Sequence, residues 1–104
     1  MSTKGAEKQE RKISELAEIA NQDFPDIEVR TFKGAFRFGA KSAVEKSQFE
    51  SWEEVSQQPV SIRRKFFKSL LEESRSHLNR ILGEDKVQPL LDKLENENEK
   101  YLQD

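Results

Sequence analysis

The stretch Arg30–Lys41, RTFKGAFRFGAK, interleaves phenylalanines with cations and decides which fold the sequence predicts. Residues Ile27–Phe32 alternate apolar and polar side chains, which is typical of a half-buried strand. Residues Ala35–Ala40 alternate in the same way, and Lys33–Gly34 between them suits a tight turn. This pattern predicts an antiparallel β-hairpin, to which Ser42–Glu45 could add a short third strand.

The phase of the alternation supports a break at the turn. Ile27 and Val29 are odd-numbered, whereas Phe36 and Phe38 are even-numbered, so one unbroken strand would divide them between two faces. A turn or bulge resets the phase and lets both pairs face one core. Phe36 and Phe38 are then expected to share the buried face, with Arg37 on the opposite side.

Helical periodicity dominates the rest of the chain. The expected elements are a helix from about Arg11 to just before Asp23, a short helix capped by Ser47 or Ser51, a helix capped by Ser61 and ending near Leu82 with Gly83 as C-cap, and a last helix that carries Leu90, Leu94 and Leu102. The short link at Gly83–Asp85 favours an antiparallel pair for the last two helices. The predicted fold class is α+β: an N-terminal helix, a small antiparallel β-hairpin or three-stranded sheet, a short helix and a long C-terminal helical hairpin. Residues 1–10 are expected to be a flexible tail, and residues 11–104 a single small domain.

The composition limits both the core and the chemistry. Of 104 residues, 34% are hydrophobic and 37% are charged, so we expect a small core that a partner or a second copy completes. The chain has no cysteine, which excludes disulfides and thiolate metal sites. Without a signal-peptide pattern or a long apolar run, we expect a cytoplasmic protein that does not enter a membrane.

The last two helices suggest the first functional hypothesis. Their apolar stripes run past the length that the shorter elements can cover, so the sequence predicts a surface for a protein partner or a homodimer. The candidate partner-binding residues are Leu91, Leu94, Asn98, Tyr101 and His77. On this interpretation the protein is a non-enzymatic cytoplasmic binding or regulatory protein that acts through protein–protein contacts of its C-terminal helices.

Uneven charge suggests the alternative, a nucleic-acid-binding regulator. Residues 27–68 hold 9 basic and 5 acidic side chains, whereas residues 69–104 hold 5 basic and 9 acidic ones. Cations that contact phosphates would come from the basic face of residues 30–41 and from the start of the long helix. These candidates are Arg30, Lys33, Arg37, Arg63, Arg64, Lys65 and Lys68. The overall isoelectric point near 5.6 argues against this alternative.

Catalytic and cofactor motifs are weak in the sequence. The four glycines are isolated, so no phosphate-cradling loop is predicted. His77 is the single histidine, and Ser74 precedes it by one helical turn, which is common on helices and a poor basis for catalysis or metal binding. We therefore expect a protein that is not an enzyme and that holds no cofactor or metal.

Overall fold

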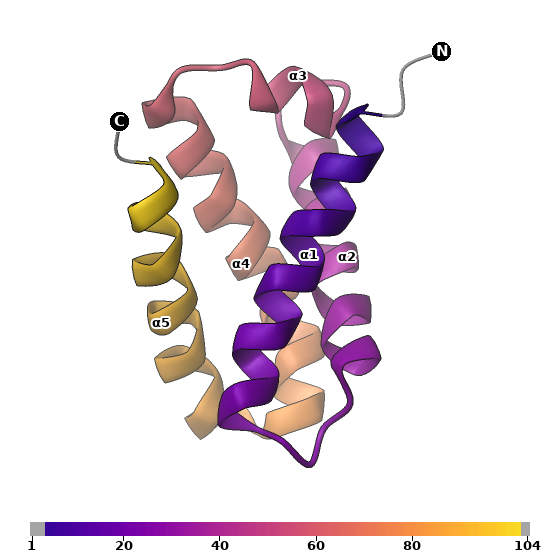
Figure 1. The fold of residues 1–104 in the computed structure, drawn as a ribbon, viewed down its shortest axis with the longest axis vertical. Helices are drawn as coiled ribbons and strands as arrows, with labels where there is room; N and C mark the ends of the chain where they lie inside the picture. The colour runs from indigo at the N-terminus through magenta and orange to yellow at the C-terminus, as the bar shows by residue number, and fades with distance from the viewer. Residues whose placement is uncertain (1–3, 103–104) are drawn as a thin grey trace.

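The computed structural model describes the backbone of residues 4–102 and the side chains of residues 7–100. Within that range every regular element is a helix: four long helices run alternately up and down, and a short helix lies across one end of the bundle (Figure 1). The helices are α1 (Lys4–Asp23), α2 (Val29–Lys46), α3 (Trp52–Ser56), α4 (Val60–Leu82) and α5 (Glu84–Leu102). The prediction of an α+β fold is therefore wrong.

Helix α2 replaces the β-hairpin that the sequence was expected to form, including its third strand. The buried positions of α2 recur at helical spacing and are Phe32, Ala35, Phe36, Gly39, Ala40 and Ala43. A helix also removes the phase conflict, because no turn is needed at Gly34 to bring these residues to one face. Phe36 is fully buried, whereas Phe38 is 44% exposed, so the expectation that they share a buried face is wrong.

Helices α2 and α4 cross in close contact. Gly39 lies at this crossing, where an added Cβ atom would overlap Ser74 Oγ and lie 2.6 Å from the Leu70 carbonyl oxygen. The buried Ser74 hydroxyl donates a hydrogen bond to that carbonyl at 2.8 Å. Glycine is thus the residue that allows the two helices to approach at this point.

Helix α1 begins earlier than the periodic pattern predicted. Residues 1–3 lie outside the described residues, but α1 starts at Lys4 and so includes residues 4–10 of the segment expected to be a flexible tail. Its buried face carries Ile13 and Leu16. The helix ends at Asp23, where the Asn21 side-chain amide donates to the Ile27 carbonyl at 2.6 Å and braces the following loop.

The C-terminal helical hairpin and the short helix agree with the sequence analysis. Gly83 ends α4 with a φ of 90°, which glycine adopts without strain, and α5 begins at the next residue. Ser51 caps α3 and accepts a hydrogen bond from the Glu54 backbone N–H at 3.3 Å. Pro59, not Ser61, occupies the N-cap position of α4.

Of the neighbouring long helices, α1 and α5 have the weakest packing against each other. We call the contact between them the α1–α5 seam. In Figure 1 the two helices are close at the end opposite α3 and diverge toward α3. The close end is joined by an ion pair of 2.8 Å between Lys93 Nζ and Asp23 Oδ1. Nowhere in residues 4–102 is a helix both long and apolar enough to cross a bilayer.

Candidate functional site

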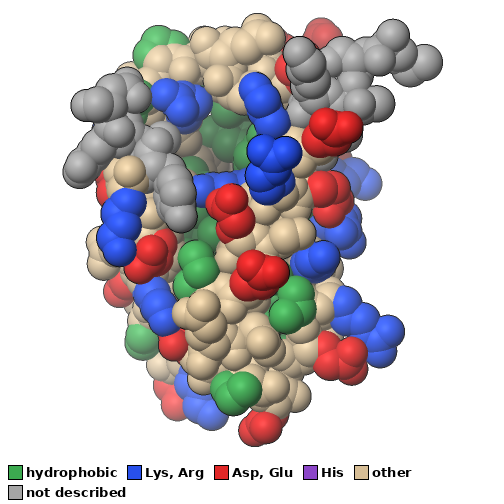
Figure 2. Space-filling view, viewed as in Figure 1, with side chains coloured by type: hydrophobic (Ala, Val, Ile, Leu, Met, Phe, Trp, Pro, Cys, Tyr) green, Lys and Arg blue, Asp and Glu red, His purple; other side chains and the backbone are tan. Residues whose placement is uncertain are grey.

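The wide end of the α1–α5 seam holds a cavity of about 280 Å³, which we call the α3-end pocket. Figure 2 shows a hollow at this end of the molecule, with hydrophobic side chains in its depth and both basic and acidic side chains around it. Its lining residues are Lys8, Lys12, Trp52, Val55, Ser56, Arg63, Phe66, Phe67 and Asn98. Four helices contribute to this lining: α1, α3, α4 and α5.

The apolar part of the pocket is built by α3 and α4. Because α3 crosses the end of the bundle, Trp52 packs edge-on against Phe66, with ring centroids 5.4 Å apart and planes at 82°. Val55 is buried beside them, one turn further along α3. The Ser56 hydroxyl is already engaged, since it donates to the Glu53 carbonyl at 2.6 Å.

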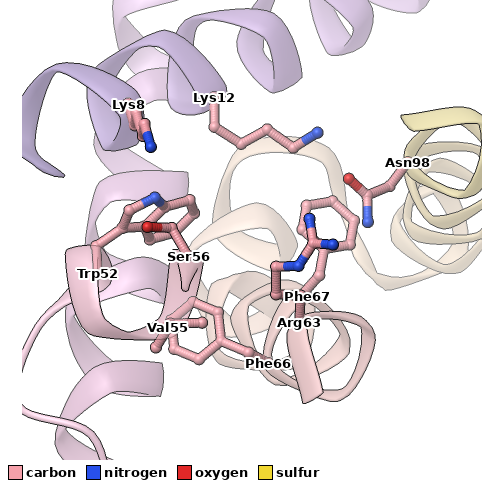
Figure 3. Close-up of a pocket in the computed structure, with 9 residues that line it drawn as sticks. All are labelled: Lys8, Lys12, Trp52, Val55, Ser56, Arg63, Phe66, Phe67 and Asn98. Atoms are coloured by element: carbon pink, nitrogen blue, oxygen red, sulfur yellow. The ribbon is translucent and has the colours of Figure 1, made fainter. Parts of the chain in front are cut away.

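The polar part is built by α1, α4 and α5. Figure 3 shows the Lys12 ammonium, the Arg63 guanidinium and the Asn98 amide directed toward one another across the pocket. Lys12 Nζ lies 5.2 Å from the centroid of the Phe67 ring, within the range of a cation–π contact. Arg63 Nε donates to the Gln58 carbonyl at 2.9 Å, which fixes the guanidinium and leaves its terminal nitrogens for other acceptors.

Burial affects two of the polar lining residues, Lys12 and Asn98. Partial burial lowers the pKa of Lys12, and the Glu15 carboxylate, 3.9 Å away, opposes that shift. Asn98 is only 6% exposed as a whole residue, and its amide faces the pocket. Among the described residues the fully buried side-chain atoms without a partner are instead His77 Nδ1 and Asn79 Oδ1, so the Asn98 amide can be reached from the pocket by a ligand or by water.

The charge of the pocket is positive. Its lining contains Lys8, Lys12 and Arg63, and among the described lining residues there is no aspartate or glutamate. Positive charge beside aromatic rings suits an anionic group carried on an apolar stem. The described residues include no group of three potential metal ligands, so we assign no metal site to them.

The predicted partner-binding residues separate into different environments. Leu91 and Leu94 are buried among the helices of this chain, at 3% and 0% exposure, and so do not form a free apolar surface. Asn98, expected on the same stripe, lines the α3-end pocket. The Tyr101 side chain lies outside the described residues. His77 is half-buried on α4 and stacks on Phe38, with ring centroids 4.3 Å apart.

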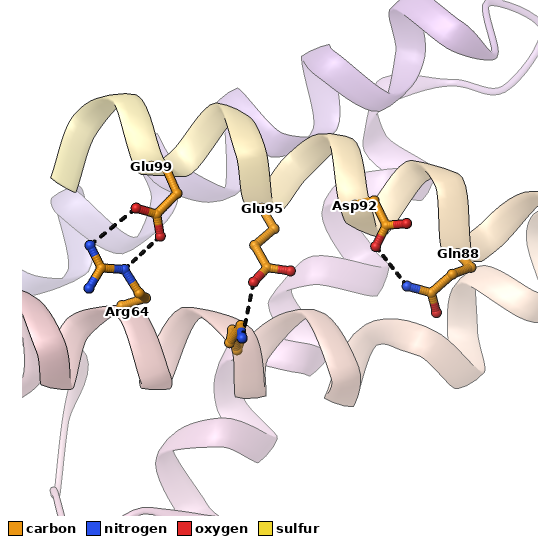
Figure 4. Close-up of polar contacts among 6 residues, drawn as sticks. Arg64, Gln88, Asp92, Glu95 and Glu99 are labelled. Atoms are coloured by element: carbon orange, nitrogen blue, oxygen red, sulfur yellow. Dashed lines mark hydrogen bonds and ion pairs between the residues drawn. The ribbon is translucent and has the colours of Figure 1, made fainter. Parts of the chain in front are cut away.

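Most cations proposed to contact nucleic acid are paired within the chain. Figure 4 shows that Arg64 of α4 donates two hydrogen bonds to the Glu99 carboxylate of α5. Its Nε atom donates at 2.6 Å and its Nη2 atom at 3.1 Å. The other three pairs are Lys68 with Glu95, Arg37 with Glu10, and Arg30 with Glu28. The opposite charges of the middle and C-terminal segments therefore meet largely between α4 and α5. Lys33 and Lys65 remain outside these pairs, and Arg63 faces the pocket.

The suggested pair of Ser74 and His77 does not form an open site. Ser74 is fully buried in the α2–α4 crossing and donates to a backbone carbonyl. The His77 Nδ1 atom is buried without a hydrogen-bond partner among the described groups, beneath the exposed ring of Phe38. The two side chains lie on the same helix, but Ser74 has no exposed surface at which a substrate could reach it.

Arg63 and Asn98 were predicted to bind, but on different surfaces, whereas Lys8, Lys12 and Trp52 were not predicted as site residues. Lys8 and Lys12 are one helical turn apart, so their common side of α1 was recognisable. Their approach to Trp52 depends on how α3 crosses the bundle, which no local pattern indicates.

Comparisons of the chain with protein-family models, with curated proteins and with solved structures found no match. The functional proposal therefore depends on the chemistry of the α3-end pocket.

Proposed function

We propose that this is a non-enzymatic cytoplasmic binding protein that contacts a protein partner through the α3-end pocket. The observation that carries the proposal is the convergence of the Asn98 amide with Lys12 and Arg63 beside aromatic rings in one pocket. The proposal keeps protein binding as the function but places it at the end of the bundle, because Leu91 and Leu94 are already buried by the chain itself.

Energetic cost supports a functional role for these groups. Burial of Lys12 disfavours its charged form, as the lowered pKa indicates, and an apolar side chain at the same place would avoid that penalty. Asn98 likewise places an amide where a leucine would fit the apolar stripe of α5. Proteins commonly retain such unfavourable groups where they are needed for binding.

The nucleic-acid alternative is the weaker proposal. Four of its candidate cations, Arg30, Arg37, Arg64 and Lys68, already pair with carboxylates of the same chain. A surface that binds phosphates needs cations free to replace counterions along a backbone. Lys33 and Lys65, on different helices, offer little of such a surface.

A peptide-display selection tests protein binding at this pocket. Random peptides are selected on the immobilised protein and then compared on Lys12→Glu, on Arg63→Glu and on the matched control Lys41→Glu, which reverses an exposed cation outside the pocket. We expect an enriched family that binds the wild type and Lys41→Glu but not the two pocket variants. Failure to enrich any family, or equal binding to all four proteins, would contradict the proposal.

A further inference from the structure

The α3-end pocket has two chemically different ends. Trp52, Val55 and Phe66 lie at one end, and Lys12, Arg63 and Asn98 meet at the other. A volume of about 280 Å³ corresponds to roughly nine water volumes, which is enough for one ring with a small head group. The shape and chemistry therefore fit a single side chain or a small aromatic acid better than an extended polymer.

The polar end is arranged to hold a planar anion. The Nε atom of Arg63 donates to the Gln58 carbonyl, which leaves the terminal nitrogens to bind a ligand. The edge that these two nitrogens form matches a carboxylate with two parallel hydrogen bonds. Lys12 supplies a second positive charge. The amide of Asn98 supplies a neutral donor from the opposite wall.

Burial distinguishes this site from a phosphate-binding surface. The Lys12 side chain is only 20% exposed, and Asn98 is 6% exposed, so an anion must enter the recess on a stem to reach them. Phosphates along a nucleic-acid backbone are instead held by exposed cations. The aromatic end then offers Trp52 and Phe66 to whatever ring or alkyl group carries the anion.

We infer that the pocket recognises a carboxylate attached to an aromatic or apolar group, presented by an acidic residue next to an aromatic residue in the partner protein. This inference rests on the proposed function and adds the chemistry of the ligand. The positive charges of Lys12 and Arg63 at the polar end and the absence of an acidic residue among the described lining residues point to this occupant.

Trp52 is the single tryptophan of the chain, so its fluorescence reports directly on the pocket. The titration uses phenylacetate and phenylacetamide, which share a shape and differ in charge. A charge-assisted hydrogen bond lost in the amide predicts at least about tenfold weaker binding of phenylacetamide. We expect the ratio of the two dissociation constants, amide over acid, to approach one in Lys12→Met and in Arg63→Met. The ratio should persist in Lys41→Met.

Three outcomes would overturn the inference: equal affinity for the acid and the amide, tighter binding of phenyl phosphate than of phenylacetate, or an unchanged ratio in both pocket variants. Helical circular dichroism checks that each variant is folded, and the two separate substitutions guard against one of them failing to fold. A pair of peptides containing Phe-Glu or Phe-Gln extends the comparison to a protein source, and the Phe-Glu peptide is expected to bind more tightly.

The two tests fail in distinguishable ways. Display peptides that depend on Lys12 and Arg63 but lack acidic residues would refute the inferred ligand while leaving the proposed function in place. Phenylacetate binding that depends on the same residues, with no enriched peptide, would support the anion site and refute binding of a protein partner.

Discussion

At the crossing of α2 and α4 there is no room for one more methyl group, whereas the α1–α5 seam leaves a cavity of about 280 Å³ at its α3 end. Both contacts belong to the same small bundle. The cavity is therefore a local feature and does not reflect a chain with too few apolar residues to pack. Its polar and cationic lining further distinguishes it from the apolar gaps that arise from imperfect packing.

The largest expected effect comes from adding a methyl group at the tight crossing. Gly39→Ala places its Cβ atom against Ser74 Oγ and 2.6 Å from the Leu70 carbonyl, so the helices must move apart. We expect the free energy of unfolding to fall by about 2–3 kcal/mol, the usual range for overpacking a core. Urea denaturation measures this value.

Gly34→Ala is the matched control on the same helix. Gly34 is exposed, and an added Cβ atom would meet no other atom within 4 Å. Because alanine favours a helix more than glycine does, we expect the free energy of unfolding to rise by about 0.5–1 kcal/mol. A rise in the free energy of unfolding for Gly39→Ala as well would show that the α2–α4 crossing has room for a methyl group.

An apolar substitution at the wide end of the α1–α5 seam should raise the free energy of unfolding, in contrast to Gly39→Ala at the α2–α4 crossing. Asn98→Leu replaces the pocket-facing amide of a buried residue with an apolar side chain of similar size. We expect a gain in stability of about 0.5–1 kcal/mol, since the amide is only partly compensated there, together with weaker binding of phenylacetate. A loss of stability in urea denaturation would mean that Asn98 has a structural role.

Acid should lower the free energy of unfolding through several carboxylates, each of which is paired with groups on a neighbouring helix. The Arg37 hydrogen bonds lower the pKa of Glu10, those from Ser42 and Lys46 lower that of Glu73, and those from Arg64 lower that of Glu99. Each folded pKa lies below the ordinary value of about 4.5, so the stabilisation is present above that pH and is lost as pH falls further.

We therefore expect urea midpoints that are steady down to about pH 5 and that decline toward about pH 3. Glu99→Gln and Glu73→Gln should reduce the size of this decline. A midpoint that stays constant across the range would contradict the assigned carboxylate pairs.

The smallest effect is expected at the closed end of the seam. Lys93→Met removes an ion pair with Asp23 whose two side chains are 37% and 41% exposed. Pairs of this kind contribute about 0.2–1 kcal/mol, and salt screens them. We expect a loss at the low end of that range and unchanged phenylacetate binding. A large loss in urea denaturation would show that this pair, and not helix packing, holds the seam closed.

Local patterns predicted the helices that have one clear period. The spacing of apolar residues and the capping residues predicted the end of α4 at Leu82, its C-cap at Gly83 and the N-cap of α3 at Ser51. Helix α2 was mistaken because two windows of six residues also satisfy a period of two. The longer spacing from Phe32 through Phe36 to Ala40 was the stronger signal, and the apparent need for a phase break at Gly34 indicated that the shorter period was wrong.

The site was predicted only in fragments for a physical reason. Arg63 and Asn98 are distinctive within their own helices, so sequence analysis could select them. Their meeting with Lys12 and Trp52 depends on the divergence of α1 from α5 and on the crossing of α3, which are properties of packing between segments distant in the sequence.

The most direct test of the anion site is the side-chain amide signal of Asn98 in nitrogen–proton correlation spectra during a phenylacetate titration. We predict that this signal and the Trp52 indole signal shift together and saturably with the acid, and that phenylacetamide shifts the Asn98 signal far less. Shifts confined to exposed lysines of α2, with the Asn98 amide unmoved, would contradict the account.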